Sequence, residues 1–239
     1  MSRSSWSREA DAGLNGVAAG SPAHLAPLMT LFSASFPTGG FAYSHGLEAA
    51  VREGYVTSAE AVRDWIDFLL RQGSGWNDLV LAAGAHRAVA EAASPDLREL
   101  CELATALSGS AERRVETTRL GEAFVAAASP WIGESPFDGI PMPLPVAAGA
   151  VTARAGLALN ETLVAYAHNF AGSLLAAAVR LVPLGQSEWV GVMHDLLPVI
   201  ETSARNAARS TLDDLGSAAI VSEIAAMRHE TLGTRLFRS

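Results

Sequence analysis

Apolar residues recur at three- and four-residue spacing along most of the chain, and this period constrains the fold more than any other feature. Leu25, Leu28, Met29 and Phe32 form the first such stripe, which is the pattern of a helix with one buried face. The alternation of apolar and polar residues that marks a half-buried strand is almost absent. We therefore predict an all-α protein, a single-domain compact helical bundle of about 9–10 helices.

Capping residues and helix breakers place the ends of these helices. The long apolar helix that opens the last third of the chain is predicted to end at Pro183, and the next helix is predicted to kink at Pro198 because proline lacks a backbone donor. The range 129–145 contains five prolines and is predicted to be the longest loop. The predicted helix starts are Leu25, Ser44, Thr57 with Glu60 as a capping box, a residue near Asn77, Ser94-Pro95-Asp96, Ser110, Asn160, Ser187 and Ala218.

The chain divides into three predicted parts. Residues 1–24 mix charged and small residues without the uninterrupted apolar stretch of a secretory signal, so we predict a disordered N-terminal extension. Residues 25–228 form the predicted helical domain, and residues 229–239 form a tail. The most apolar segment, 163–184, carries His168, Asn169 and Arg180, which favours a buried core helix over a membrane span.

Composition excludes several classes of chemistry. The chain has a formal net charge of −8, which argues against a nucleic-acid partner. All of its 17 cationic residues are arginines, so it has no lysine for a phosphate-binding loop or a Schiff base. Cys101 is the only cysteine, so the chain can form neither an intrachain disulfide nor a thiolate metal cluster. A cytoplasmic location fits this composition best.

The sequence contains no compact catalytic motif. Its six histidines include no pair at metal-binding helical spacing, so we predict neither a metal site nor a cofactor. Ser44 and His45 could be a nucleophile and its base, but no GxSxG elbow surrounds the serine. Glu112 and Glu116, four residues apart, are expected to lie on one solvated helix face. We therefore predict that the chain is not an enzyme and has no catalytic residue, and a hydrolase using Ser44 and His45 is the weaker alternative.

Two segments are candidates for recognition. The first, Phe36 to Glu48, interleaves aromatic rings with polar groups around two adjacent glycines, so it is either a recognition loop or an interhelix turn whose Phe41 and Tyr43 fill the core. The second is the tail, in which Leu236 and Phe237 stand between two arginines. The tail either anchors in the groove of a partner protein or folds back on its own bundle.

At these two segments the sequence resembles the UreF family of urease accessory proteins. The family's N-terminal signature corresponds to Pro37–Glu48 and its C-terminal signature to His229–Ser239. Between them, three further segments resemble family motifs in the same order, namely Glu116-Thr117 with Gly121, Pro145–Gly149 and Arg180–Gln186. The resemblance implies an all-α fold without a known catalytic site.

The resemblance also implies partners. A UreF protein would bind UreD (also called UreH) and the GTPase UreG, engage apo-urease so that nickel reaches its active site, control GTP hydrolysis by UreG, and form a homodimer. A direct nickel carrier using His45, His229 and Glu230 is the alternative. The residues that we predict to contact partners on this basis are Phe41, Tyr43, Ser44, His45, Glu48, Gln186, His229, Glu230, Arg235, Leu236 and Phe237.

Overall fold

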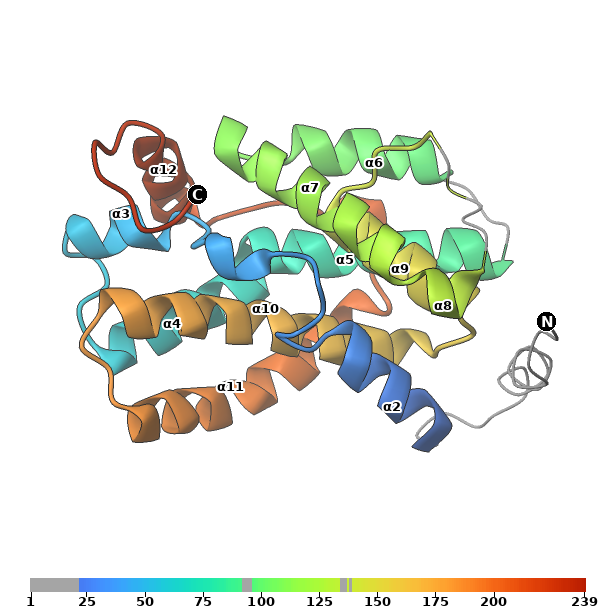
Figure 1. Ribbon diagram of the computed structural model, residues 1–239, viewed down its shortest axis with the longest axis horizontal. Coiled ribbons are helices and arrows are strands. Elements are labelled where there is room, and N and C mark those ends of the chain that lie inside the picture. Colours follow the sequence, from blue (N-terminus) through green and yellow to red (C-terminus); the bar gives the residue numbers. More distant parts are fainter. Residues whose placement is uncertain (1–21, 92–95, 134–136, 138) are drawn as a thin grey trace, which may run out of the picture.

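The computed structural model describes residues 22–91, 96–133, 137 and 139–239, and these residues form helices joined by turns, with no strand among them. The prediction of an all-α bundle is confirmed. In chain order (Figure 1) the elements are α2 (Pro22–Leu31), η2 (Gly40–Ala42), α3 (Leu47–Arg52), α4 (Ala59–Gln72), α5 (Ser74–Glu91), α6 (Leu97–Ala106), α7 (Ala111–Ala127), α8 (Ser129–Ile132), α9 (Leu144–Arg154), α10 (Leu159–Leu181), α11 (Gln186–Ala207), η3 (Leu212–Asp214) and α12 (Ile220–His229).

Small residues let the central helices approach closely. A Cβ atom on Gly149 in α9 would lie 2.1 Å from the carbonyl oxygen of Ala82 in α5, and one on Gly121 in α7 would lie 2.0 Å from the carbonyl oxygen of Met142. No side chain larger than that of glycine fits at either position without moving backbone. Helix α9 therefore packs closely against α5, and α7 packs closely against the residues that lead into α9.

Helix α10 is the central helix of the bundle and contacts α2, α3, α4, α5, α9 and α11. It is long and apolar enough to cross a membrane by length and composition, but 56% of its most apolar window is buried inside the protein. Leu163, Tyr166, Phe170 and Leu174 are all on its buried side. The stripe repeats every three to four residues, as expected of a helix packed within a core.

Several helix ends differ from their predicted positions. Ser110 caps α7 as predicted by accepting a hydrogen bond from the backbone N–H of Arg113 at 3.2 Å. The N-cap of α4 is Ser58 and not Thr57, because the Ser58 hydroxyl is the one that accepts from the backbone of Ala61. Asn160 is likewise not an N-cap: α10 begins one residue before it, after Ala158, without a side-chain cap.

Other predicted boundaries shift by one to three residues. Helix α2 begins at Pro22, inside the predicted extension 1–24, and residues 1–21 lie outside the described part of the chain. Helix α6 begins after Asp96, while Ser94 and Pro95 also lie outside the description. Helix α3 begins at Leu47 instead of Ser44, and α5 begins at Ser74 instead of near Asn77. Helix α11 begins at Gln186 instead of Ser187, and α12 begins at Ile220 instead of Ala218. Helix α11 runs through Pro198 as one helix.

The C-terminal residues and the segment that leads into α3 are brought together by their packing on the bundle. Helix α12 packs against α3 and the beginning of α7, and the residues that follow it return across α3 toward the 40–45 segment (Figure 1). The two segments predicted to carry recognition, far apart in sequence, therefore lie side by side.

Candidate functional site

The turn before α3 has a backbone that favours glycine. Gly39 and Gly46 have φ values of 79° and 78°, and His45 adopts φ 59° between them. A left-handed conformation at a residue with a Cβ costs about 1–2 kcal/mol. A Cβ atom on Gly46 would lie 2.8 Å from the backbone of Ala226, so this glycine is what allows α12 to rest on the turn.

The carboxylate of Glu48 holds the tail segment, which we define as residues 230–239. Its side chain is 0% exposed and accepts the backbone N–H groups of Leu236 and Phe237, each at 3.0 Å. Arg52 donates to the same carboxylate at 2.8 Å. Burial alone would raise the pKa of Glu48, but these donors and His229 hold it below its ordinary value.

A second carboxylate extends this network. The Nδ1 atom of His229 lies 2.7 Å from Glu112 Oε2, and its Nε2 atom lies 3.5 Å from Glu48 Oε2. The His229 side chain is 0% exposed. Arg235 pairs with the other oxygen of Glu112. The imidazole thus links α3, α7 and α12, and the tail segment is tied to α7 as well as to α3.

The last residues of the tail segment complete the attachment. The backbone N–H of Arg238 donates to the carbonyl of Ala42 at 2.8 Å, and the N–H of Ser44 donates to the carbonyl of Ser239 at 2.9 Å. Phe237 is 4% exposed, and the guanidinium of Arg180 lies 4.5 Å from its ring centroid. The tail therefore folds back on its own bundle, which was one of the two predicted alternatives.

A buried polar cluster lies beneath this attachment. Glu116 is 5% exposed and pairs with Arg113, and the hydroxyl of Ser239 donates to it. His45 Nδ1 lies 3.6 Å from Glu116, and His45 Nε2 lies 2.7 Å from the hydroxyl of Ser74. Burial raises the pKa of Glu116, but Arg113 and His45 outweigh it and lower the pKa to about 2. Burial and Arg113 lower the pKa of His45 to about 4.

This geometry does not support a hydrolytic pair at Ser44 and His45. The hydroxyl of Ser44 donates to the carbonyl of Ser239, while the imidazole of His45 faces Ser74 and Glu116. A histidine with a pKa of about 4 is also a weak base near neutral pH. Both residues instead hold other parts of the chain in place.

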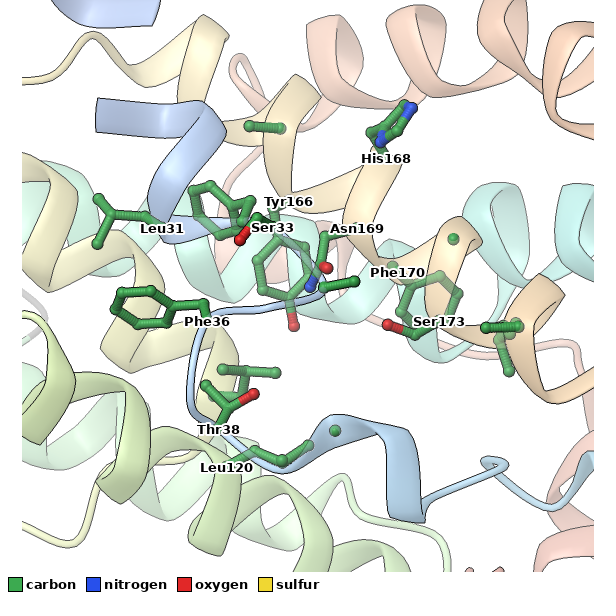
Figure 2. A pocket seen from close by; sticks show the side chains of 18 of the residues that line it. Leu31, Ser33, Phe36, Thr38, Leu120, Tyr166, His168, Asn169, Phe170 and Ser173 are labelled. Carbon is green, nitrogen blue, oxygen red and sulfur yellow. The ribbon is translucent and has the colours of Figure 1, made fainter. Parts of the chain in front are cut away.

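Three residues of this cluster, His45, Arg113 and Glu116, also line a large cavity. The cavity has a volume of about 930 Å³ and lies between α2, the 33–43 segment, α7 and α10 (Figure 2). Its walls are mainly apolar and include Phe36 and Phe170. Tyr166 and Asp78 also line the cavity, where Tyr166 donates to Asp78 at 2.8 Å and burial raises the pKa of Asp78 to about 6.

Ten of the eleven residues predicted to contact partners divide into two groups. Five side chains face solvent at least in part, namely those of Phe41, Tyr43, Glu230, Leu236 and the ion-paired Arg235. Ser44, His45, Glu48, His229 and Phe237 are buried, and they hold the tail segment and the turn before α3 in position. Gln186 begins α11, and its side chain lies outside the described part of the structure.

The nickel-carrier hypothesis required His45, His229 and Glu230 to converge. His229 faces Glu48 and Glu112, while Glu230 accepts the backbone N–H of Ala111 at 2.8 Å. Among the residues that the structure describes, no group of three or more His, Cys, Asp or Glu side chains is arranged to hold a metal ion.

Two acidic residues of this site were assigned to the wrong environment. Glu112 and Glu116 were expected on a solvated face of α7, but both bind the tail segment. The spacing of four residues was correct for one face of a helix. What the spacing does not reveal is that the tail segment covers that face. The match of Glu116-Thr117 to a family motif was the available signal.

Together, the fold and the site define an all-helical protein whose C-terminal segment is locked against its own N-terminal turn. The sequence model of the UreF family matches residues 56–197. The urease accessory protein UreF of Agrobacterium fabrum is 48% identical over 219 residues, which cover 91% of this chain and 97% of that protein. UreF 1 of Brucella anthropi is 47% identical over 215 residues, covering 89% and 92%. The chain belongs to the UreF family of urease accessory proteins.

Proposed function

We propose that this chain is an adaptor that joins UreD to the GTPase UreG and controls GTP hydrolysis by UreG while nickel is inserted into apo-urease. Its membership of the UreF family supports a role beside urease. The observation that carries the proposal is the attachment of the tail segment to the 40–45 segment, because each of the two holds an apolar side chain in an exposed position. Phe41 is 81% exposed and Leu236 is 59% exposed. Exposed apolar groups on a rigid support are typical of protein-binding surfaces.

Helix α12 supports the same proposal. Ile220, Ile224 and Met227 lie at spacings of four and three residues, and they are 65%, 37% and 48% exposed. The opposite face of this short helix is buried against the bundle through Ala225 and His229. An exposed stripe at this spacing is the pattern by which a helix docks into a groove of another protein.

We also propose that the chain forms a homodimer in the cytoplasm. Exposed apolar side chains of α2 at the mouth of the large cavity support self-association, since Leu25 is 58% exposed and Met29 is 67% exposed. Light scattering on the purified chain tests the dimer. A monomer at all concentrations measured would contradict it, and Met29→Asp is expected to shift the equilibrium toward monomer.

Co-purification with UreD and UreG tests the adaptor proposal. Leu236→Asp and Ile224→Asp place a charge on the proposed surface without removing a buried group, and each is expected to reduce recovery of the complex and activation of urease. Val190→Asp on α11 is the matched control, because Val190 is 60% exposed on a different helix. If the wild-type chain recovers neither UreD nor UreG, the proposal is wrong.

A further inference from the structure

A small pocket lies between the beginning of α7 and the tail segment. It has a volume of about 320 Å³, and its lining includes Tyr43, Val115, Arg119 and Arg238. Both arginines are exposed, and Val115 is 46% exposed, so the pocket opens to solvent. We call it the arginine pocket.

The arginine pocket has an unbalanced charge. Neither Arg119 nor Arg238 forms an ion pair with another residue that the structure describes. Of the two carboxylates of the lining, Glu112 pairs with Arg235 and also contacts His229, and Glu230 accepts the backbone N–H of Ala111 at 2.8 Å. Among the residues that the structure describes, Glu230 has no cationic partner, so two unpaired arginines stand against one unpaired carboxylate and the lining keeps a net positive charge.

The chemistry of this lining selects a carboxylate. A guanidinium presents parallel N–H donors that match the two oxygens of a carboxylate. The phenolic hydroxyl of Tyr43 supplies a further donor at the same pocket. Apolar side chains are also available beside the arginines, because Val115 belongs to the lining and Leu236 is exposed two residues before Arg238. These apolar side chains would contact the apolar residues that flank an acidic side chain on a partner protein. They would add nothing to the binding of a free anion.

We infer that the arginine pocket receives the carboxylate of an aspartate or glutamate on the protein that docks beside the tail segment. The inference rests on the proposed adaptor function and adds to it the chemistry of the contact. The pocket exists only while the tail is attached, because Arg238 is placed by its own backbone hydrogen bond to Ala42 at 2.8 Å. Recognition of the acidic side chain thus requires the folded-back tail.

The test compares three double variants of the full chain. Arg119→Glu with Arg238→Glu reverses both charges of the pocket. Arg119→Lys with Arg238→Lys keeps the charges and removes the paired donors. Arg98→Glu with Arg205→Glu is the control, because it alters the net charge equally at exposed positions on α6 and α11. Circular dichroism and urea unfolding establish that each variant is folded, and the affinity for purified UreD and for purified UreG is measured at low and high salt.

The charge reversal is expected to weaken binding of one of the two partners about tenfold or more and to flatten the salt dependence that the wild-type chain shows. The affinity of the lysine variant is expected to lie between those of the wild type and the charge-reversed variant. The control is expected to bind like the wild type. Wild-type affinity in the charge-reversed variant would overturn the inference while leaving the adaptor function intact. Equal losses in the control would also overturn it, since net charge would then explain them. Failure of the wild-type chain to bind either partner would instead refute the adaptor function.

Discussion

At the scale of single residues, the site depends on carboxylates that are buried and fully used. Glu48 is the clearest case, because one side chain that is 0% exposed receives two backbone N–H groups, an arginine and a histidine. Buried charges are tolerated only when they are paired in this way. The backbone N–H groups that attach the tail also stabilise the buried carboxylate, so tail attachment and local stability are linked.

Glu48→Gln is expected to destabilise the protein. The substitution removes the charge that Arg52 and His229 face and replaces one acceptor oxygen with a donor opposite the tail N–H groups. The expected loss in the free energy of unfolding is about 2–4 kcal/mol. Urea unfolding measures it. Glu60→Gln is the control, since the Glu60 side chain is 77% exposed and its loss should change stability by less than about 0.5 kcal/mol.

Asp78→Asn is expected to change the pH dependence of stability. Folding raises the pKa of Asp78 from 3.8 to about 6, so the folded state holds this proton more tightly than the unfolded state. The wild-type protein therefore loses stability at this site as the pH rises from 3.8 to about 6. The asparagine variant lacks this loss, and its stability relative to wild type should increase by about 2 kcal/mol across that window. Urea unfolding of both proteins at pH 4 and pH 7.5 measures this change. The same difference in the free energy of unfolding at both pH values would contradict the prediction.

At the scale of elements, the position of α12 depends on one glycine. Gly46 has φ 78°, and a Cβ there would lie 2.8 Å from the backbone of Ala226. Gly54 has nearly the same φ, 79°, with nothing within 4 Å of its Cβ position. A comparison of alanine substitutions at the two glycines therefore distinguishes the cost of a left-handed backbone from the cost of displacing a helix.

Gly46→Ala should cost more than Gly54→Ala. Both variants place a Cβ in the left-handed region, which costs about 1–2 kcal/mol. Only the variant at Gly46 also collides with α12, so we expect a total loss of about 3 kcal/mol or more together with reduced binding of UreD. Thermal unfolding and co-purification measure both effects. Equal losses at the two positions would mean that α12 accommodates the extra methyl group.

The start of α4 gives a second test at this scale. The hydroxyl of Ser58 accepts the backbone N–H of Ala61 at 3.2 Å, while Thr57 precedes the cap. Ser58→Ala is expected to cost about 1 kcal/mol and Thr57→Ala less than half of that. Urea unfolding of the two single variants decides the assignment, and the reverse order would restore Thr57 as the cap.

At the scale of the whole molecule, local patterns predicted the helices better than they predicted the site. The apolar segment 163–184 with its polar residues His168, Asn169 and Arg180 was correctly predicted as a core helix, because that signal lies within one element. Cap positions were sometimes wrong by a residue, since adjacent polar residues such as Thr57 and Ser58 compete for the same role. The sequence offers no local sign of contacts between residues more than a hundred positions apart.

The candidate site shows this limit most clearly. Both recognition segments were found from composition and family motifs, but nothing in either one predicts that Glu48 binds the N–H of Leu236, 188 residues away. Glu116 was placed on a solvated face for the same reason. Phe237 was predicted as an anchor for a partner, and its ring is 4% exposed in the protein's own core.

Hydrogen exchange should report the tail and the bundle as one cooperative unit. The amides of Leu236 and Phe237 donate to a buried carboxylate, so we expect them to exchange far more slowly than the amide of Gly233 in the exposed part of the tail. NMR exchange on the full chain measures the difference, and Glu48→Gln should remove it. Rapid exchange of all three amides in the wild type would show that the tail opens independently of the bundle.

The attachment of the tail can form only late in the synthesis of the chain. A chain emerging from the ribosome makes Glu48 early, but the groups that pair with it from α12 and the tail follow about 180 residues later, because Glu48 and His229 are 181 positions apart. Long-range contacts of this kind form late in folding. A chain that lacks α12 and the tail segment therefore leaves Glu48 paired with Arg52 but without His229 and the tail N–H groups, and it lacks the folded-back surface. The folded-back surface therefore forms only after α12 and the tail segment have been synthesised, and the proposed binding face appears later than the helices that carry it.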